Sequence, residues 1–286
     1  MGKTKIEYCD EVSNPLYARL KGDETSKIGT FCEKPDKDGS CSRCWAETLN
    51  LRFGNKLTFD KANRDKIEWK FRHQELNRIA RLNAKKPMSE KFAGLPTVVF
   101  CFDTFDIFQP SITDEMRDIV FNFYDELTNL ILLVQTTYPA KMNHYFKDRY
   151  GVDGLPSQYW IGMSAGTQKF YDDNIRYLRL TKASQKYVIF EPLLESIKIN
   201  TARFLYDANI SKTPQFTFII VGGESGTNAR PFQWSWAGDL KTVCEITNTA
   251  FFMKQGGAYQ DKHYKDFNLF PKHLQVRQFP RSTTTR

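Results

Sequence analysis

The sequence contains few cysteines, few histidines and no long uninterrupted apolar segment. Only 6 cysteines and 4 histidines occur among 286 residues, which excludes the cysteine-dense class of disulfide-stapled secreted domains. No stretch approaches the roughly 20 apolar residues that a bilayer-spanning helix needs. The N-terminus lacks the apolar core of a signal peptide, and Ile6 stands where a myristoylation signal has Ser or Thr. We therefore expect a cytoplasmic protein with no membrane partner, whose cysteines are thiols or metal ligands.

The charge balance is basic, although the basic residues form no single tract. Lys and Arg number 41 against 33 Asp and Glu, which gives a net charge of +8. A positive balance favours an anionic partner, above all nucleic acid. Many basic proteins bind no anion, so charge alone leaves the partner open between nucleic acid, a nucleotide-linked substrate and none.

Short apolar runs recur along the chain, separated by segments of helix length. Most runs are continuous rather than alternating, which is typical of strands buried on both faces of a parallel sheet. The runs predict strands over residues 3–8, 96–102, 130–135, 159–163, 187–190, 216–221 and 250–253. Apolar spacing and end signals predict helices over residues 66–82, 113–127, 172–180 and 235–246, with Thr113 as an N-cap.

Alternation of strands and helices predicts an α/β fold. We expect a (β/α) barrel, full or partial, with mainly parallel strands, and an open doubly wound sheet is the alternative. The barrel is expected to be a single domain over residues 1–258 with a cysteine loop at 32–44. Residues 259–286 would then be a C-terminal extension with a partly disordered tail.

Three cysteines lie close together in one polar loop. Cys32, Cys41 and Cys44 follow the pattern C-x8-C-x2-C. Three thiolates can bind three irons of a [4Fe–4S] cluster and leave the fourth iron open, or they can form part of a zinc site. Unligated cysteines are the third interpretation, although a loop rich in charge and glycine is a poor place for them. Cys9, Cys101 and Cys244 are expected to be small core residues.

Polar or small residues also follow the predicted strands. In a (β/α) barrel the C-terminal ends of the strands converge on one mouth, where the active site lies. The candidate site residues at these ends are Asp103, Asp106, Ser164, Glu191, Gly222, Gly223, Glu224 and Lys254. For each of them an ordinary strand end, a turn or a structural ion pair is the competing interpretation; for Asp103 and Asp106 the paired partner would be a basic residue such as Lys141 or Arg230.

A series of ordered motifs carries a family resemblance. They lie at residues 4–7, 41–47, 103–108, 135–142, 160–164, 191–194, 221–226, 229–231 and 252–257. Through them the chain resembles the phage Gp37/Gp68 (DUF5131-like) family, a distant branch of the radical S-adenosylmethionine enzymes. The sequence departs from the usual radical-enzyme loop, which is C-x3-C-x2-C with an aromatic residue where Arg43 stands. It also has Tyr8 and Thr137 where the family has tryptophan and a basic residue.

The resemblance implies a cofactor chemistry. Cys32, Cys41 and Cys44 would hold a [4Fe–4S] cluster whose open iron binds S-adenosylmethionine, and one electron would cleave the sulfonium to start radical chemistry. Glu224 would hold the ribose hydroxyls or the amino group of S-adenosylmethionine, and Glu191 would bind the cofactor or the substrate. A flavodoxin or ferredoxin would supply the electron.

The phage setting and the basic charge suggest the substrate. We expect a radical isomerase that rearranges a substituent on a modified thymine of phage DNA, in the host cytoplasm. The alternatives are a zinc- or cluster-bearing nucleic-acid-binding protein without catalysis and a radical base-repair lyase.

Overall fold

The computed structural model describes residues 3–34, 39–211, 214–259 and 261–280. Residue contacts divide the chain into two compact units, Met1–Tyr145 and Phe146–Arg286. The domain boundary predicted at residue 258 stays a prediction. The predicted disordered tail at 281–286 and part of the cysteine loop, at 35–38, lie outside the described residues.

The first unit contains a parallel sheet and a separate antiparallel pair of strands. The parallel strands occur in the order β1 (Glu11–Ser13), β4 (Val98–Cys101) and β5 (Ile131–Thr136). The antiparallel pair is β2 (Leu16–Leu20) with β3 (Ile67–Phe71). Val98, Val99 and Cys101 are fully buried, which explains why this strand appears in the sequence as a continuous apolar run.

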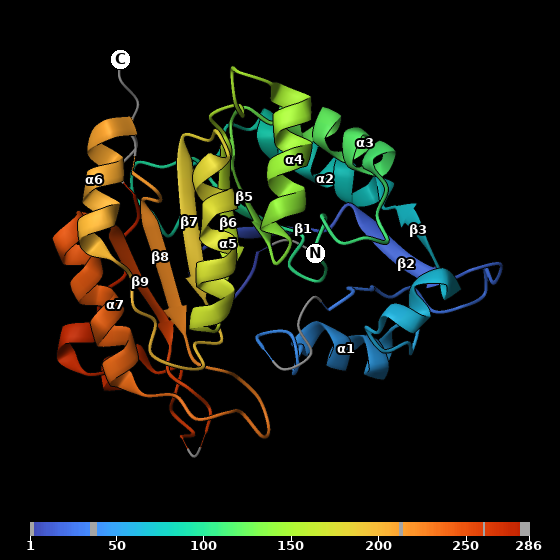
Figure 1. The fold of residues 1–286 in the computed structure, drawn as a ribbon. Helices are drawn as coiled ribbons and strands as arrows, with labels where there is room; N and C mark the ends of the chain where they lie inside the picture. The colour runs from blue at the N-terminus through green and yellow to red at the C-terminus, as the bar shows by residue number, and fades with distance from the viewer. Residues whose placement is uncertain (1–2, 35–38, 212–213, 260, 281–286) are drawn as a thin grey trace. The chain divides into compact units, whose positions relative to one another are not determined.

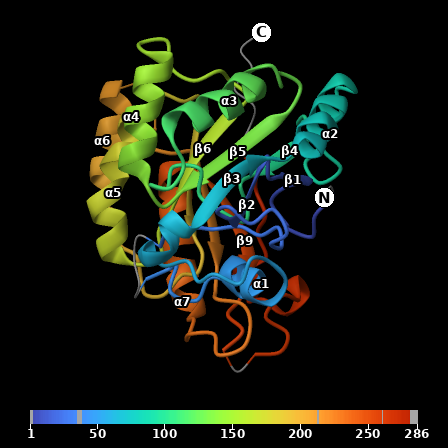
Figure 2. The same ribbon diagram turned by 90° about the vertical axis from the view of Figure 1, so that its right-hand side faces the viewer.

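Four helices accompany these strands, and a short 3-10 turn, η1 (Lys61–Lys66), precedes β3. They are α1 (Trp45–Phe53), α2 (His73–Ala84), α3 (Asp114–Asp125) and α4 (Pro139–Tyr150), which leads into the second unit. Thr113 caps α3 as predicted, because its hydroxyl accepts a hydrogen bond from the N–H of Met116 at 3.3 Å. In the view of Figure 2, α1 lies below the β2–β3 pair.

Two predictions for the first unit are wrong. Residues 3–8 form no strand; Lys3 makes an isolated bridge with Glu11, and the first strand is β1. The helix predicted over 66–82 begins only at His73, because Ile67 and Trp69 alternate with outward-facing neighbours and form β3. Alternation with a period of two places successive side chains on opposite faces of a strand.

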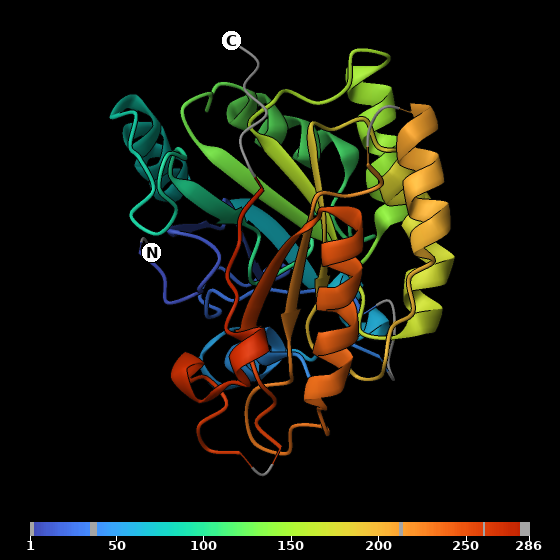
Figure 3. The same cartoon turned by 90° about the vertical axis from the view of Figure 1, so that its left-hand side faces the viewer.

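The second unit is a four-stranded parallel sheet with helices against it. Its strands are β6 (Tyr159–Ser164), β7 (Gln185–Phe190), β8 (Phe218–Gly222) and β9 (Ala250–Gln255), paired in that order. Its helices are α5 (Gln168–Leu180), α6 (Thr201–Ser211) and α7 (Trp234–Thr247). These helices cover one face of the sheet (Figures 1 and 3). Each of the four strands lies within two residues of its predicted start.

The C-terminal segment packs on the strands of the second unit. It contains the short turns η2 (Phe267–Leu269) and η3 (Lys272–Leu274). The N–H of Gln278 donates to the carbonyl of Phe251 at 2.9 Å, and the ring of Phe279 contacts Phe218 at a centroid distance of 4.8 Å. The extension is thus held by backbone hydrogen bonds and aromatic packing.

The α/β fold class predicted from the sequence is confirmed. Parallel strands alternate with helices along the chain, three in the first unit and four in the second, as in a partial (β/α) barrel. Within the described residues, no helix combines the length and apolar character needed to cross a membrane.

Candidate functional site

Three cysteine thiols of the first unit lie within electrostatic reach of one another. Cys32, Cys41 and Cys44 are each partly exposed. Burial raises the pKa of the Cys32 thiol well above its ordinary value, and the negative charges of Asp106, Cys41 and Cys44 raise it further. Interactions of this kind fall with distance, so the thiols of Cys41 and Cys44 lie near enough to Cys32 to influence its pKa; their role as metal ligands stays a prediction.

Cys44 lies at the N-terminus of a helix. It is the N-cap residue of α1, with extended backbone angles and no side-chain capping hydrogen bond. Burial raises the pKa of the Cys44 thiol, but the backbone N–H groups of Glu47 and Ala46 lower it in part. The first turn of a helix favours a negative charge, so this position suits a thiolate.

A buried glutamine holds the backbone on both sides of Cys32. Gln109 is fully buried. Its side-chain NH2 donates to the carbonyl of Phe31 at 2.9 Å, and its side-chain oxygen accepts from the N–H of Glu33 at 2.8 Å. Arg117 in turn donates to the carbonyl of Gln109 at 2.9 Å. Gln109 therefore fixes the backbone around Cys32 through hydrogen bonds that do not involve the Cys32 thiol.

Asp106 connects the same loop to β5. Its carboxylate accepts hydrogen bonds from the N–H of Phe108 at 2.9 Å and the N–H of Thr137 at 2.6 Å. The hydroxyl of Thr136 also donates to it at 2.9 Å. Burial raises the pKa of Asp106, and these donors lower it in part. The backbone N–H of Asp106 also favours the Cys32 thiolate. The carboxylate of Asp106 therefore stabilises the local structure, while its backbone N–H contacts the Cys32 sulfur.

A buried asparagine joins the two ends of the cysteine loop. Asn50, on α1, is 3% exposed. Its side-chain oxygen accepts from the N–H of Thr30 at 3.1 Å, and its NH2 donates to Asn55 at 2.7 Å. Gly29 is required here, because a Cβ atom on it would come within 2.3 Å of the Asn50 oxygen. The chain before Cys32 is thus attached to the helix that follows Cys44.

Asp103 and Asp106 do not pair with the basic residues considered for them. Asp103 accepts a hydrogen bond from Asn14, and burial raises its pKa. Lys141 instead pairs with Asp114 at 2.8 Å, and Arg230 pairs with Glu224. Asp103 and Asp106 therefore act in hydrogen-bonded networks at the end of β4.

The donor set of the first unit suits an iron–sulfur cluster in composition. Among the described residues, no three His, Cys, Asp or Glu side chains converge on a single metal position. In a [4Fe–4S] cluster each cysteine binds a different iron atom, and three cysteines leave one iron open. Cys32, Cys41 and Cys44 provide that number of thiols.

The candidates of the second unit lie at the C-terminal ends of its strands. Glu191 follows β7 and forms an ion pair with Lys254 of β9, and both side chains are 17% exposed. Gly222 lies beside this pair, where a Cβ atom would come within 3.2 Å of the Glu191 side chain. Ser164 ends β6 and is 5% exposed. The carboxylate and the ammonium group of this pair are thus partly exposed at this edge.

Glu224 and Gly223 have structural partners. The Glu224 carboxylate accepts from the N–H of Arg230 at 2.7 Å and from its guanidinium at 2.5 and 3.0 Å. A Cβ atom on Gly223 would come within 2.5 Å of the Gly257 backbone. Gly223 therefore allows its backbone to pack closely against the backbone of Gly257.

Sequence reasoning missed the residues that support the thiols. Gln109 directly follows the 103–108 motif, so its position could have drawn attention, but Asn50 lies in an ordinary helix and carries no such signal. Tyr138 was named only as part of a motif; its hydroxyl donates to the carbonyl of Glu33. Burial and the charges of Cys32 and Asp106 raise its pKa.

Comparison with known proteins gives one match. The sequence matches the family described as "Protein of unknown function (DUF5131)" over residues 3–280. No curated protein and no solved structure matches it.

Proposed function

Since the chain belongs to the DUF5131 family, whose function is unknown, we propose that it is a radical S-adenosylmethionine enzyme. Cys32, Cys41 and Cys44 would hold its [4Fe–4S] cluster. The observation that carries this proposal is the grouping of three thiols in one loop, whose backbone is held by the buried side chains of Gln109 and Asn50. A loop whose thiols served only packing would not need this support.

The chain's own residues would hold and orient the cluster. When bound, such a cluster supplies the electron that cleaves S-adenosylmethionine, and this chemistry belongs to the cofactor. The N–H groups of Ala46 and Glu47 would stabilise the Cys44 thiolate. Gln109 would keep the Cys32 backbone in place through its two hydrogen bonds. Hydrogen bonds to the ligands of a cluster tune its potential.

The second unit offers candidate groups for the organic cofactor. S-adenosylmethionine has an amino-acid end with one positive and one negative charge. The Glu191–Lys254 pair presents both complementary charges at 17% exposure. Glu224 is the weaker candidate, because Arg230 already occupies its carboxylate.

We assign the reaction to rearrangement of a substituent on a modified thymine in phage DNA, with a flavodoxin or ferredoxin as electron donor. The net charge of +8 supports a polyanionic substrate. The family resemblance supports the phage setting and the radical chemistry.

Anaerobic reconstitution tests the cofactor class. The full chain is incubated with iron and sulfide, and bound iron, acid-labile sulfide and 5′-deoxyadenosine formed with dithionite are measured. We expect cluster binding and 5′-deoxyadenosine in the wild type and their loss in Cys41→Ala. Cys244→Ala is the matched control, since Cys244 is buried on α7 and should leave both unchanged.

A different metal content would overturn the proposal. A colourless protein that retains zinc through the same cysteines would support the nucleic-acid-binding alternative. A protein that keeps its cluster in Cys41→Ala would show that the loop is not the ligand set.

A nucleoside digest tests the substrate. DNA from a phage carrying the gene and from a deletion strain is hydrolysed and compared by mass spectrometry and chromatography. An isomerase changes the retention time of one modified nucleoside at constant mass. Identical profiles would sink the assignment to DNA while leaving the cofactor class untouched.

A further inference from the structure

Helix α2 in the first unit exposes a face without acidic side chains. Its single acidic residue, Glu75, is 5% exposed and accepts two hydrogen bonds from Arg78, at 2.9 and 3.0 Å. The exposed side chains of the helix and its C-terminal turn are neutral or basic: His73, Gln74, Asn77, Arg81, Ala84, Lys85 and Lys86. An acidic partner would meet no repulsion from the helix itself.

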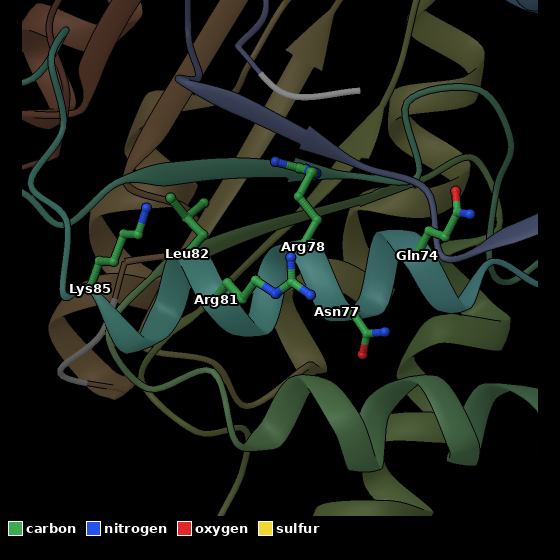
Figure 4. Close-up of a pocket in the computed structure, with 6 residues that line it drawn as sticks. All are labelled: Gln74, Asn77, Arg78, Arg81, Leu82 and Lys85. Atoms are coloured by element: carbon green, nitrogen blue, oxygen red, sulfur yellow. The ribbon is translucent and has the colours of Figure 1, made fainter.

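Part of this face is hollowed. A cavity of about 390 Å3 is lined by Gln74, Asn77, Arg78, Arg81, Leu82 and Lys85 (Figure 4). We call the four exposed members, Gln74, Asn77, Arg81 and Lys85, the α2 stripe. Spacings of three and four residues place them along one side of the helix. The stripe therefore combines two amides and two cations.

The two cations of the stripe are available to a ligand. The side chains of Arg81 and Lys85 make no hydrogen bond or ion pair within the described part of the chain. Arg78 differs from them, because it reaches towards β1, where it pairs with Glu11 at 2.9 Å and donates to the carbonyl of Val12 at 2.7 Å (Figure 4). Arg78 therefore anchors the helix and leaves Arg81 and Lys85 to face solvent.

We propose that the α2 stripe binds the sugar–phosphate backbone of duplex DNA. Arginine, lysine, glutamine and asparagine are the side chains that commonly contact phosphates. Arg81 and Lys85 are about 6 Å apart along the helix axis, so both can contact phosphates of the same DNA strand. A straight row of donors suits a regular linear polyanion.

The stripe is also linked to the C-terminal end of β4. Arg78 binds β1, and Asn14, directly after β1, donates to Asp103 at the end of β4. These contacts lie within one unit, so a DNA backbone on α2 has a fixed place relative to this strand end. The choice of DNA as the polyanion rests on the proposed function. The positive charge of the stripe is a property of Arg81 and Lys85 and does not depend on that function.

Salt-dependent binding tests the inference. Anisotropy of a labelled, unmodified duplex of about 30 base pairs is measured from about 50 to 200 mM salt. Removing two phosphate contacts in R81Q/K85Q should lower the slope of log affinity against log salt by about 2, whatever the sequence of the duplex. The charge-retaining R81K/K85R should restore the slope.

The matched control removes the same charge elsewhere. Lys262 and Lys272 are exposed lysines of the second unit, and K262Q/K272Q should leave the slope unchanged. Equal slopes for R81Q/K85Q and the wild type, or an equal fall in the control, would overturn the proposal. Cluster content and 5′-deoxyadenosine formed without DNA separate this result from the proposed function, because R81Q/K85Q should not change either.

Discussion

The cysteine loop of the first unit and the strand ends of the second unit hold their polar groups in different ways. In the loop, Gln109 and Asn50 bind backbone atoms close to Cys32 rather than a thiol. At the strand ends, the candidate residues bind one another: Glu191 with Lys254, and Glu224 with Arg230. A side chain that already has a hydrogen-bonding or ion-pairing partner stabilises the fold, and a ligand must compete with that partner to bind it.

This difference changes how strand-end residues should be interpreted. The loop stood out in the sequence through the spacing of its three cysteines, and the second region through polar residues after apolar strands. The first has a supporting layer of buried side chains around its cysteines, which is what a functional site needs. In the second, the charged groups of the Glu191–Lys254 pair are partly exposed. The cysteine loop is therefore the firmer candidate site.

Among the substitutions that test this comparison, Gly223→Ala should cause the largest loss of stability. A Cβ atom there meets the Gly257 backbone at 2.5 Å, and backbone cannot yield as a side chain does. We expect a loss of about 3 kcal/mol or more in unfolding free energy, measured by urea denaturation. Gly222→Ala is the control, because its Cβ atom meets side chains alone, Glu191 at 3.2 Å and Gln255 at 3.4 Å, and should cost about 1 kcal/mol or less. Equal stability of the two variants would contradict a structural role for Gly223.

The strands that were predicted correctly are those whose burial depends on their own residues. Residues 250–253 form a continuous apolar run, and β9 begins at residue 250. β1 was misplaced because it contains Glu11, whose burial depends on an ion pair with Arg78, 67 residues away. β3 was missed because a window of helical length included its alternating residues.

The site divides in the same way. Cys32, Cys41 and Cys44 are close in sequence, so their spacing alone predicts a shared function. Gln109 reaches Phe31 and Glu33 across 78 and 76 residues, and its place after the 103–108 motif does not reveal these contacts. Supporting residues of this kind depend on the tertiary structure, which a single sequence does not reveal.

A smaller effect is expected from Gln109→Ala in the first unit. The substitution leaves the buried carbonyl of Phe31 and N–H of Glu33 without their partner, which costs about 2 kcal/mol. If the support matters for function, the variant also retains less iron after reconstitution than its loss of stability explains. Gln135→Ala is the matched control, because the Gln135 side-chain oxygen has no hydrogen-bond partner in the described chain. Full iron content in a destabilised Gln109→Ala would reduce Gln109 to a packing role.

The smallest effect compares two lysines of the second unit. Lys254 pairs with Glu191, whereas Lys186, on β7, is 9% exposed and donates only to the carbonyl of Arg179 at 3.1 Å. Burial and the positive charge of Arg179 lower the pKa of Lys186 from 10.5 to about 8. Below about pH 8 the Lys186 ammonium is charged in the folded state, where burial disfavours it, and this lowers the free energy of unfolding.

Lys186→Met should therefore stabilise the protein by about 1 kcal/mol at pH 7. The folded pKa lies below the unfolded one, so the wild type loses its penalty as the pH rises from about 8 to 10.5. The advantage of the variant should shrink over that range in urea unfolding curves. If the difference in unfolding free energy between wild type and variant is the same at pH 7 and pH 9.5, the charge of Lys186 carries no penalty in the folded state. Lys186 would then be stabilised as well as Lys254 is by its ion pair with Glu191.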